Sequence, residues 1–319
     1  MAIERPVIFP SSGYDLFGML TLPEAEWHQE RVGVILLAGG IIPRSHRNRM
    51  WVKAARRLAA LGFYVLRFDY RGVGDSSGSL FEMRLDRPFT EDVVAAATFL
   101  RKVANVDRLI LAGTCFGALT VLSAVEAAAP IDGLILAATP IFERERRRFK
   151  PPGERRLRRL LRKVGEQRVI RSILAGETLD AAWRVVTRLA SAGAKTTEAI
   201  MSLFMRIFRS DNGPGSSVAP SQRVSEQFAQ PFIAALRTQV PVLFIYGEED
   251  FSYAEFSVSV DGLVARAGAP RSEPGYELHL LKGEVHRFLS VRIQEEVVDK
   301  LVDWVASRFS APCGAPRIR

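Results

Sequence analysis

The sequence is short of cysteine and of long apolar runs, and each shortage excludes a class of protein. Its 319 residues contain only two cysteines, Cys115 and Cys313, too few for a disulfide framework. No run of about 18 or more apolar residues occurs, so we expect no transmembrane helix. The first residues also lack the basic and apolar segments of a signal peptide. These absences predict a soluble protein of the cytoplasm.

Motifs for phosphate, dinucleotide and metal binding are missing as well. No G-x-x-x-x-G-K-[ST] loop occurs, and the GVGDSSG stretch does not fit the G-x-G-x-x-G fingerprint. The four histidines and two cysteines show no metal-ligand spacing. We therefore expect neither a metal nor an organic cofactor.

The positive charge is concentrated in residues 143–171. This segment has 13 Lys and Arg residues and four Glu, a net charge of +9 that equals the net charge of the whole chain. With no basic stripe elsewhere and no interleaved aromatics, we expect no nucleic-acid binding. Leu157, Leu160, Leu161 and Val164 are spaced as on one face of an amphipathic helix. Its basic face is either solvated, or a dock for an acidic partner or anionic substrate, or a membrane-surface contact.

Short apolar runs alternate with helical patterns along most of the chain. This alternation predicts an α/β fold, a doubly wound and mostly parallel sheet. The predicted strands are 17–22, 33–38, 64–68, 108–112, 133–138, 242–246 and 277–281, and the predicted helices are 50–61, 90–104, 116–128 and 293–309.

The alternation stops over residues 142–236, which show helical periodicity but no convincing strand. We interpret 142–236 as a helical cap, or lid, inserted into a core formed by residues 1–141 and 237–319. The aromatic residues of this segment predict either an apolar substrate pocket or simply packing within the cap.

The strongest local motif is GTCFG at 113–117, between a predicted strand and a predicted helix. This is the G-x-S-x-G nucleophile elbow with Cys115 in the central position. A sharp turn there would expose the thiol at a helix N-terminus, where N–H groups and the helix dipole favour a thiolate. The competing interpretation is a small buried cysteine. The context favours Cys115 as a nucleophile.

A nucleophilic thiol needs a base and a group that orients the base. Among the histidines, His286 follows a late strand and precedes the last helix, whereas His279 lies within the strand and His28 and His46 precede the elbow in loops. Asp250 follows another buried strand, and the neighbouring Glu248 and Glu249 are alternatives for the acid. The order Cys115, Asp250, His286 is that of nucleophile, acid and base in α/β-hydrolases.

Five segments carry a resemblance to the α/β-hydrolase superfamily over nearly the full chain. They are LLAGG at 36–40, FDYRGVGDSSG at 68–78, GTCFG at 113–117, YGEED at 246–250 and GEVHRF at 283–288. Within the superfamily the chain resembles hydrolases associated with exosortase gene clusters and serine-aminopeptidase-like esterases. It departs from them in Cys115, where most members have serine. Cysteine at this position is also typical of dienelactone hydrolases and bile-acid acyltransferases. Ala38-Gly39 replaces the usual His-Gly.

The resemblance implies where an oxyanion hole would form. It assigns the two donors to the backbone N–H groups of Phe116 and Gly40. Asp69 and Arg71, in the DYRGVGDS segment, are expected to brace their loop through an ion pair rather than act on substrate.

A thiol nucleophile also predicts the class of substrate. Attack by Cys115 forms a thioester, so a thioester or activated ester is a suitable donor and an amide is not. We expect a hydrolase of small acyl substrates with a Cys-His-Asp triad. The alternative is an acyltransferase that passes the acyl group to an amine or alcohol, with an acyl carrier protein or a CoA ester as donor at the basic cap. A non-catalytic binding protein is the third hypothesis.

Overall fold

The computed structural model describes residues 2–24, 30–79, 87–127, 130–143, 223–270, 272 and 274–309. Apart from residue 143, the basic segment and its predicted amphipathic helix lie outside these ranges. Most of the predicted cap, 142–236, lies outside them too. The division into core and cap therefore stays a prediction.

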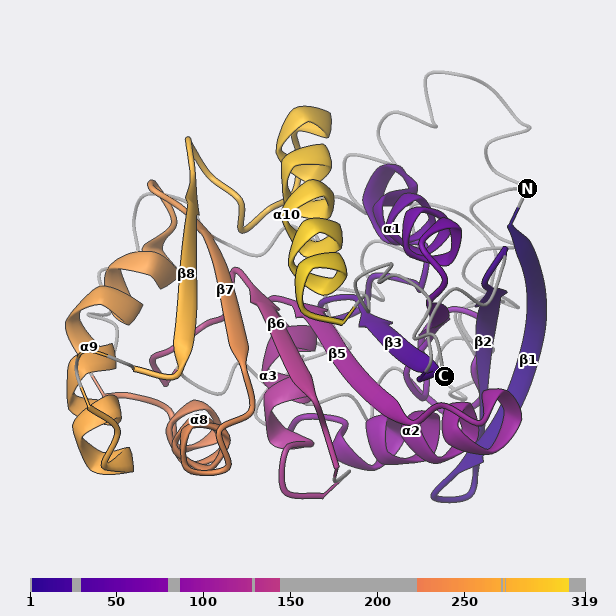
Figure 1. Ribbon diagram of the computed structural model, residues 1–319, viewed down its shortest axis with the longest axis horizontal. Helices are drawn as coiled ribbons and strands as arrows, with labels where there is room; N and C mark the ends of the chain where they lie inside the picture. The colour runs from indigo at the N-terminus through magenta and orange to yellow at the C-terminus, as the bar shows by residue number, and fades with distance from the viewer. Residues whose placement is uncertain are drawn as a thin grey trace, which may run out of the picture. The chain divides into compact units, whose positions relative to one another are not determined.

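The described residues form one eight-stranded sheet with the order β1-β2-β4-β3-β5-β6-β7-β8 (Figure 1). β1 and β2 are antiparallel to their neighbours, and every pairing from β4 to β8 is parallel. The predicted doubly wound, mostly parallel sheet is confirmed. The strands are β1 (Ile3–Ser11), β2 (Tyr14–Leu22), β3 (Val32–Leu37), β4 (Tyr64–Phe68), β5 (Arg108–Thr114), β6 (Gly133–Ala137), β7 (Val242–Gly247) and β8 (Tyr276–Leu281).

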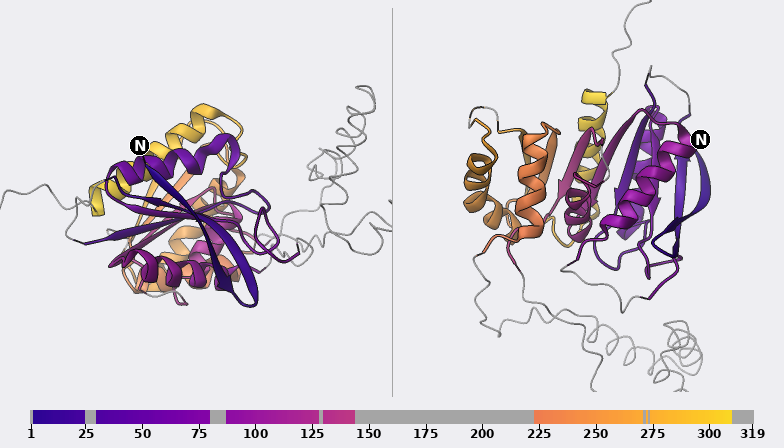
Figure 2. Two further views of the ribbon diagram at one scale, coloured as in Figure 1. Left: turned by 90° about the vertical axis from the view of Figure 1, so that its right-hand side faces the viewer. Right: turned by 90° about the horizontal axis from the view of Figure 1, so that it is seen from below.

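Helices cover both faces of this sheet (Figure 2). α1 and α10 pack together on one face, and α2, α3, α8 and α9 lie on the other, so each face has its own apolar core. Every residue of β3, β4, β6 and β7 is buried, as expected for parallel strands covered on both sides. The helices are α1 (Met50–Ala60), α2 (Thr90–Ala104), α3 (Phe116–Ser123), α8 (Glu226–Arg237), α9 (Phe251–Ala267) and α10 (Val291–Phe309), with a short 3-10 helix η1 (Arg47–Arg49) before α1.

Among the elements absent from the sequence-based prediction are β1 and α9. β1 contains Pro6 and Pro10, which cannot donate backbone hydrogen bonds, and a strand with prolines is tolerated at a sheet edge, where β1 lies. In α9 the buried residues include Phe256, Val260 and Val264. Their helical spacing was present in the sequence and would have identified α9.

α8 spans the end of the predicted cap, from Glu226 to Arg237. Its Phe228 and Phe232 are fully buried and their rings pack on Phe244 of β7. α8 is thus part of the helix layer on the sheet. In the part of the chain that the structure describes, no helix combines the length and apolarity needed to cross a membrane.

Candidate active site

Cys115 occupies the sharp turn between β5 and α3. Its backbone has φ 51° and ψ −117°, and its N–H donates to the carbonyl of Ala137 at the end of β6, 2.8 Å away. Positive φ is uncommon for a residue with a side chain and marks a constrained turn. Cys115 is only partly buried, so its thiol-bearing side chain lies at the surface of the core rather than inside it.

Two glycines allow β5 and α3 to approach each other closely. A Cβ atom on Gly113 would lie 2.4 Å from the carbonyl oxygen of Gly117. A Cβ on Gly117 would lie 2.5 Å from the carbonyl oxygen of Ala38 at the end of β3. Both distances are too short for any side chain, so the two glycines of the G-x-C-x-G motif are required by the backbone.

The loop after β3 passes directly beside the turn. A Cβ on Gly39 would lie 3.1 Å from the Cβ of Cys115 and 2.9 Å from the carbonyl oxygen of Thr114. The next residue, Gly40, has φ 57°. Phe116 is the first residue of α3, and its N–H has no acceptor within the helix. Gly40 and Phe116, the predicted oxyanion donors, therefore flank Cys115 on two neighbouring segments.

Asp250 lies at the corresponding end of β7 and caps the start of α9. Its side chain is buried, and its carboxylate accepts three backbone hydrogen bonds. Oδ2 accepts from the N–H of Gly247 at 2.8 Å, and Oδ1 accepts from the N–H groups of Val285 and His286, each at 2.9 Å. The carboxylate thus fixes the loop that carries His286.

His286 follows β8, and its side chain is partly buried. Its ring packs edge-on against Phe251, the residue after Asp250, with ring centroids 4.6 Å apart. β5, β6, β7 and β8 are parallel neighbours, so Cys115, Asp250 and His286 all follow strand ends at the same edge of the sheet. The structure therefore brings the predicted acid and base loops into direct contact, at the sheet edge that also carries the thiol.

The alternative acids are placed differently from Asp250. The backbone N–H groups of Glu248 and Glu249 bond to the carbonyls of Leu281 and Gly283, but both residues are exposed. No hydrogen bond that the structure describes joins either carboxylate to the loop of His286. Burial and hydrogen bonding favour Asp250 as the acid.

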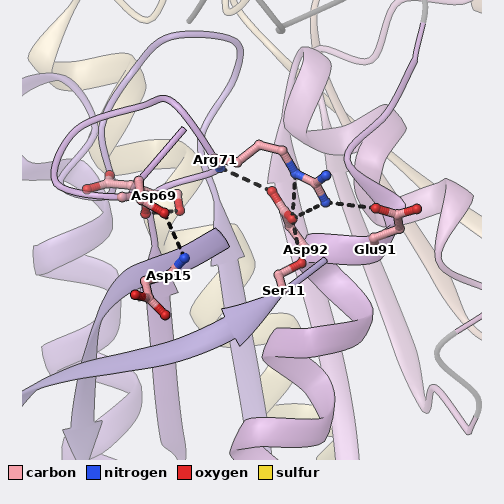
Figure 3. A network of polar contacts seen from close by, with 8 residues as sticks. Ser11, Asp15, Asp69, Arg71, Glu91 and Asp92 are labelled. Atoms are coloured by element: carbon pink, nitrogen blue, oxygen red, sulfur yellow. Dashed lines mark hydrogen bonds and ion pairs between the residues drawn. The ribbon is translucent and has the colours of Figure 1, made fainter. Parts of the chain in front are cut away.

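The expected ion pair between Asp69 and Arg71 is wrong, although both side chains do brace their loop. Asp69 is paired with Arg44, whose backbone N–H also donates to Asp69 Oδ1 at 2.5 Å. Arg71 is directed away from Asp69 and forks onto Asp92 at the start of α2, with hydrogen bonds of 3.0 and 2.6 Å to Oδ1 (Figure 3). The two side chains therefore tie the DYRGVGDS loop to Arg44 and to α2, and Asp69 Oδ2 also accepts from the N–H of Asp75 within the loop at 3.2 Å.

Arg71 and Asp92 are the centre of a wider polar network (Figure 3). Ser11 donates to Asp92 Oδ1 at 2.7 Å, and Arg71 also pairs with the exposed Glu91 at 2.9 Å. Burial would lower the pKa of Arg71, but its hydrogen bonds to Asp92 and the charges of Asp92 and Glu91 offset burial and raise that pKa. The network joins β1, the DYRGVGDS loop and α2.

His46 is the residue near this site that sequence reasoning passed over. It is buried, and its Nε2 lies 3.3 Å from Thr114 Oγ1, next to Cys115 in the chain. Burial first, and the charge of Arg47 second, lower the pKa of His46 from 6.5 to about 3. No pattern in the sequence marks this histidine, because its burial depends on Phe288, which is distant along the chain. Among the described residues, no His, Cys, Asp and Glu side chains gather as a metal site.

A sequence profile of the family described as serine aminopeptidase, S33, matches residues 29–199, more than half of the chain. The chain belongs to this S33 hydrolase family. The prediction of an enzyme of the α/β-hydrolase type is confirmed at this level. The S33 family is named for serine, whereas this member has Cys115 at the elbow. No curated protein sequence matches the chain. The finer resemblance to exosortase-associated hydrolases stays a prediction.

Solved structures show the same fold at low sequence identity. The Pyrococcus furiosus esterase Pf2001 is 16% identical with a TM-score of 0.55, over 96% of this chain and 91% of the esterase. Protein PA2218 of Pseudomonas aeruginosa is 18% identical with a TM-score of 0.54, over 96% and 94% of the two chains. XC6422 of Xanthomonas campestris, described as an α/β serine hydrolase without a lid, is 18% identical with a TM-score of 0.50, over 98% and 97%. These similarities support the hydrolase fold of this S33 member.

Proposed function

We propose that the protein hydrolyses thioesters or activated esters through a triad of Cys115, His286 and Asp250. One observation carries the proposal: the partly exposed Cys115 occupies the strained turn of a nucleophile elbow, at φ 51°. At the same sheet edge, Asp250 binds the backbone N–H of His286. The position of these residues after β5, β7 and β8, at one edge of the parallel sheet, supports the assignment of nucleophile, acid and base.

Each step of the proposed reaction uses an atom of this chain. The thiolate of Cys115 attacks the acyl carbon, and the N–H groups of Phe116 and Gly40 stabilise the oxyanion. His286 has taken the proton of the Cys115 thiol, and it gives this proton to the leaving thiolate or alkoxide as the bond to the leaving group breaks. His286 then removes a proton from water, which attacks the thioester on Cys115. The acyl–sulfur bond breaks and His286 returns the proton to the sulfur, which releases the carboxylic acid and leaves the free thiol.

The surroundings favour an apolar acyl group. Ile41, Phe251 and Leu289 are 50%, 40% and 65% exposed. They are close in sequence to Gly40, Asp250 and His286, the proposed oxyanion donor, acid and base, and Phe251 is the first residue of α9. Large exposed apolar side chains gathered around a site commonly contact a ligand.

Acyl transfer is the second candidate, because an acyl-enzyme thioester reacts with amines as well as with water. The charge of +9 in segment 143–171 favours a donor carried on an anionic group, such as an acyl carrier protein or a CoA ester. Both candidates share the acyl-enzyme on Cys115, so one experiment tests their common step.

The test is to incubate the full chain with three donors of the same acyl group: a small thioester, its CoA thioester and its carrier-protein thioester. We expect a mass increase of one acyl group on Cys115, seen by peptide mass spectrometry, followed by release of the acid. Adding an amine acceptor separates the candidates, because hydrolysis alone leaves the yield of free acid unchanged.

Cys313→Ser is the matched control, since it removes the other thiol and should leave acylation intact. Cys115→Ala should abolish both the adduct and turnover. A wild-type chain that forms no adduct with any of the donors and shows no turnover would reject the proposal in favour of a binding role. A faster reaction with the carrier-linked donor than with the small thioester would identify the donor class.

A further inference from the structure

His46 lies in the loop between β3 and α1, between an aromatic ring from the nearby start of α1 and one from a distant segment. It is 4% exposed. Its ring meets Trp51 of α1 at 5.5 Å and Phe288, after His286, at 5.0 Å, both edge-on. Histidine is intermediate among the residue types in how often it is buried. The ring thus lies between the start of α1 and the loop of the proposed base.

The backbone of His46 is held in an unusual conformation. Its φ of 58° and ψ of 175° belong to a region that is essentially restricted to glycine. The N–H of His46 donates to the carbonyl of Pro43 at 2.8 Å, and the N–H of Trp51 donates to the carbonyl of Ser45 at 3.2 Å. A residue with a side chain persists in such a conformation where its surroundings hold it there.

The polar contact of the ring is with the residue that precedes the nucleophile. Nε2 of His46 lies 3.3 Å from Oγ1 of Thr114, which is 1% exposed and ends β5. Nδ1 is buried and has no hydrogen-bond partner among the described residues. A buried N–H without an acceptor is costlier than an acceptor without a donor, so we assign the proton to Nε2, which donates to Thr114.

The ring is neutral at the pH at which enzymes normally work. Burial, aided by the nearby charge of Arg47, lowers the pKa of His46 to about 3. A neutral imidazole adds no positive charge next to the proposed Cys115 and His286 pair. It is therefore suited to be a fixed hydrogen-bond donor and not a second base.

We propose that His46 is a positioning residue, whose bond to Thr114 and contact with Phe288 hold Cys115 in register with the loop of His286. The proposal rests on the proposed function of that site. The same loop contains Gly40, so one side chain connects the segments that carry the oxyanion donor, the nucleophile and the base. A histidine that merely fills space would be replaced by another ring without effect on the thiol.

Four variants separate the hydrogen bond from the packing. His46→Phe keeps a ring against Trp51 and Phe288 but loses the donor, and Thr114→Val keeps the shape but loses the acceptor. His46→Gln and Thr114→Ser are the conservative counterparts that keep a donor or an acceptor. Thermal unfolding of each variant shows which variants are folded, so that their rates can be compared with those of the wild-type protein.

Two rates are measured on the folded variants, and the first is acylation of Cys115 by the small thioester. For His46→Phe and Thr114→Val we expect kcat to fall about tenfold to a hundredfold with little change in KM, because misplacement by a fraction of an ångström acts on the chemical step. His46→Gln and Thr114→Ser should recover most of the rate. The double variant His46→Phe/Thr114→Val should be no slower than either single one, because both remove the same bond.

The second rate is alkylation of Cys115 by iodoacetamide, which needs no substrate. A folded His46→Phe with both rates at the wild-type value overturns the role of His46, and so does a Thr114→Val with unchanged rates if His46→Phe fails to fold. If no donor acylates wild-type Cys115 while alkylation still changes in both variants, the proposed function fails and the link from His46 to the thiol stands.

Discussion

The start of α2 and the end of β7 each carry a buried carboxylate, and the two carboxylates are bound by different kinds of donor. Asp92 is 0% exposed and faces the guanidinium of Arg71, with Ser11 as a further donor. Asp250 is 3% exposed and accepts from three backbone N–H groups, with no arginine or lysine paired to it in the described residues. The two carboxylates are therefore similarly buried, but Asp92 is paired with a positive charge and Asp250 is not.

That difference indicates what each carboxylate is able to do. The ion pair neutralises Asp92 and fixes the DYRGVGDS loop on α2, which is a structural task. Backbone N–H groups hold Asp250 in place but leave a full negative charge near His286, which an imidazolium needs during catalysis. We therefore expect variants of the two residues to fail in different ways.

Of all the variants, Asp250→Asn should give the largest effect, and this effect should be a loss of activity. We expect kcat to fall by about 10³ to 10⁴-fold, the loss seen when the orienting acid of a triad is neutralised. Stability should fall less, because asparagine still accepts from Val285 and His286 and only the N–H of Gly247 loses its acceptor. Steady-state hydrolysis of a thioester, with urea unfolding of the same sample, checks both statements.

The matched controls for Asp250→Asn are Glu248→Gln and Glu249→Gln, which neutralise the exposed neighbours. Both should keep wild-type kcat. A large loss in either control, with Asp250→Asn still active, would move the acid to the glutamate and contradict the assignment.

Asp92→Asn should show the opposite behaviour, with a loss of stability and little loss of activity per folded molecule. Removing one partner of a buried pair leaves Arg71 with an uncompensated charge, at a cost of about 3 kcal/mol. The side chain of Arg71 is 15% exposed and retains Glu91, which keeps the loss at the lower end of the usual range. Urea unfolding at neutral pH measures the change in the free energy of unfolding.

Glu91→Gln is the control for Asp92→Asn on the same arginine. The Glu91 side chain is 67% exposed, so its removal should cost less than about 1 kcal/mol. Equal losses in the two variants would mean that burial does not distinguish these pairs, and the contrast with Asp250 would lose its basis.

Much of the fold was predictable because the signals are local. The predicted ranges of β4 and α2 coincide with the observed Tyr64–Phe68 and Thr90–Ala104, since apolar runs and helical spacing reflect burial directly. The elbow was predictable for the same reason, since strand, turn and helix are contiguous around Cys115. The predicted helix 116–128 was too long, and α3 ends at Ser123.

The parts that were not predictable depend on contacts between distant segments. Asp69 and Arg71 are close in sequence and opposite in charge, so pairing them was reasonable. Their real partners are Arg44, in the loop after β3, and Asp92, in α2, and they are recognised only once the strands are assembled. His46 was not predictable for the same reason, because no residue near it in the sequence indicates that its ring contacts Thr114 and Phe288.

An effect smaller than that of Asp92→Asn comes from this histidine, a third buried titratable group with neither an arginine nor a carboxylate partner among the described residues. Its pKa is about 3 in the folded protein against 6.5 for the ordinary side chain. Below pH 6.5 the His46 side chain binds a proton in the unfolded chain but not in the folded protein. The free energy of unfolding therefore falls as the pH falls towards 3. At pH 5 this amounts to roughly 2 kcal/mol. Urea unfolding at pH 7 and pH 5 should show that His46→Gln loses less stability than wild type by about this amount; equal losses would mean that the buried ring accepts a proton readily.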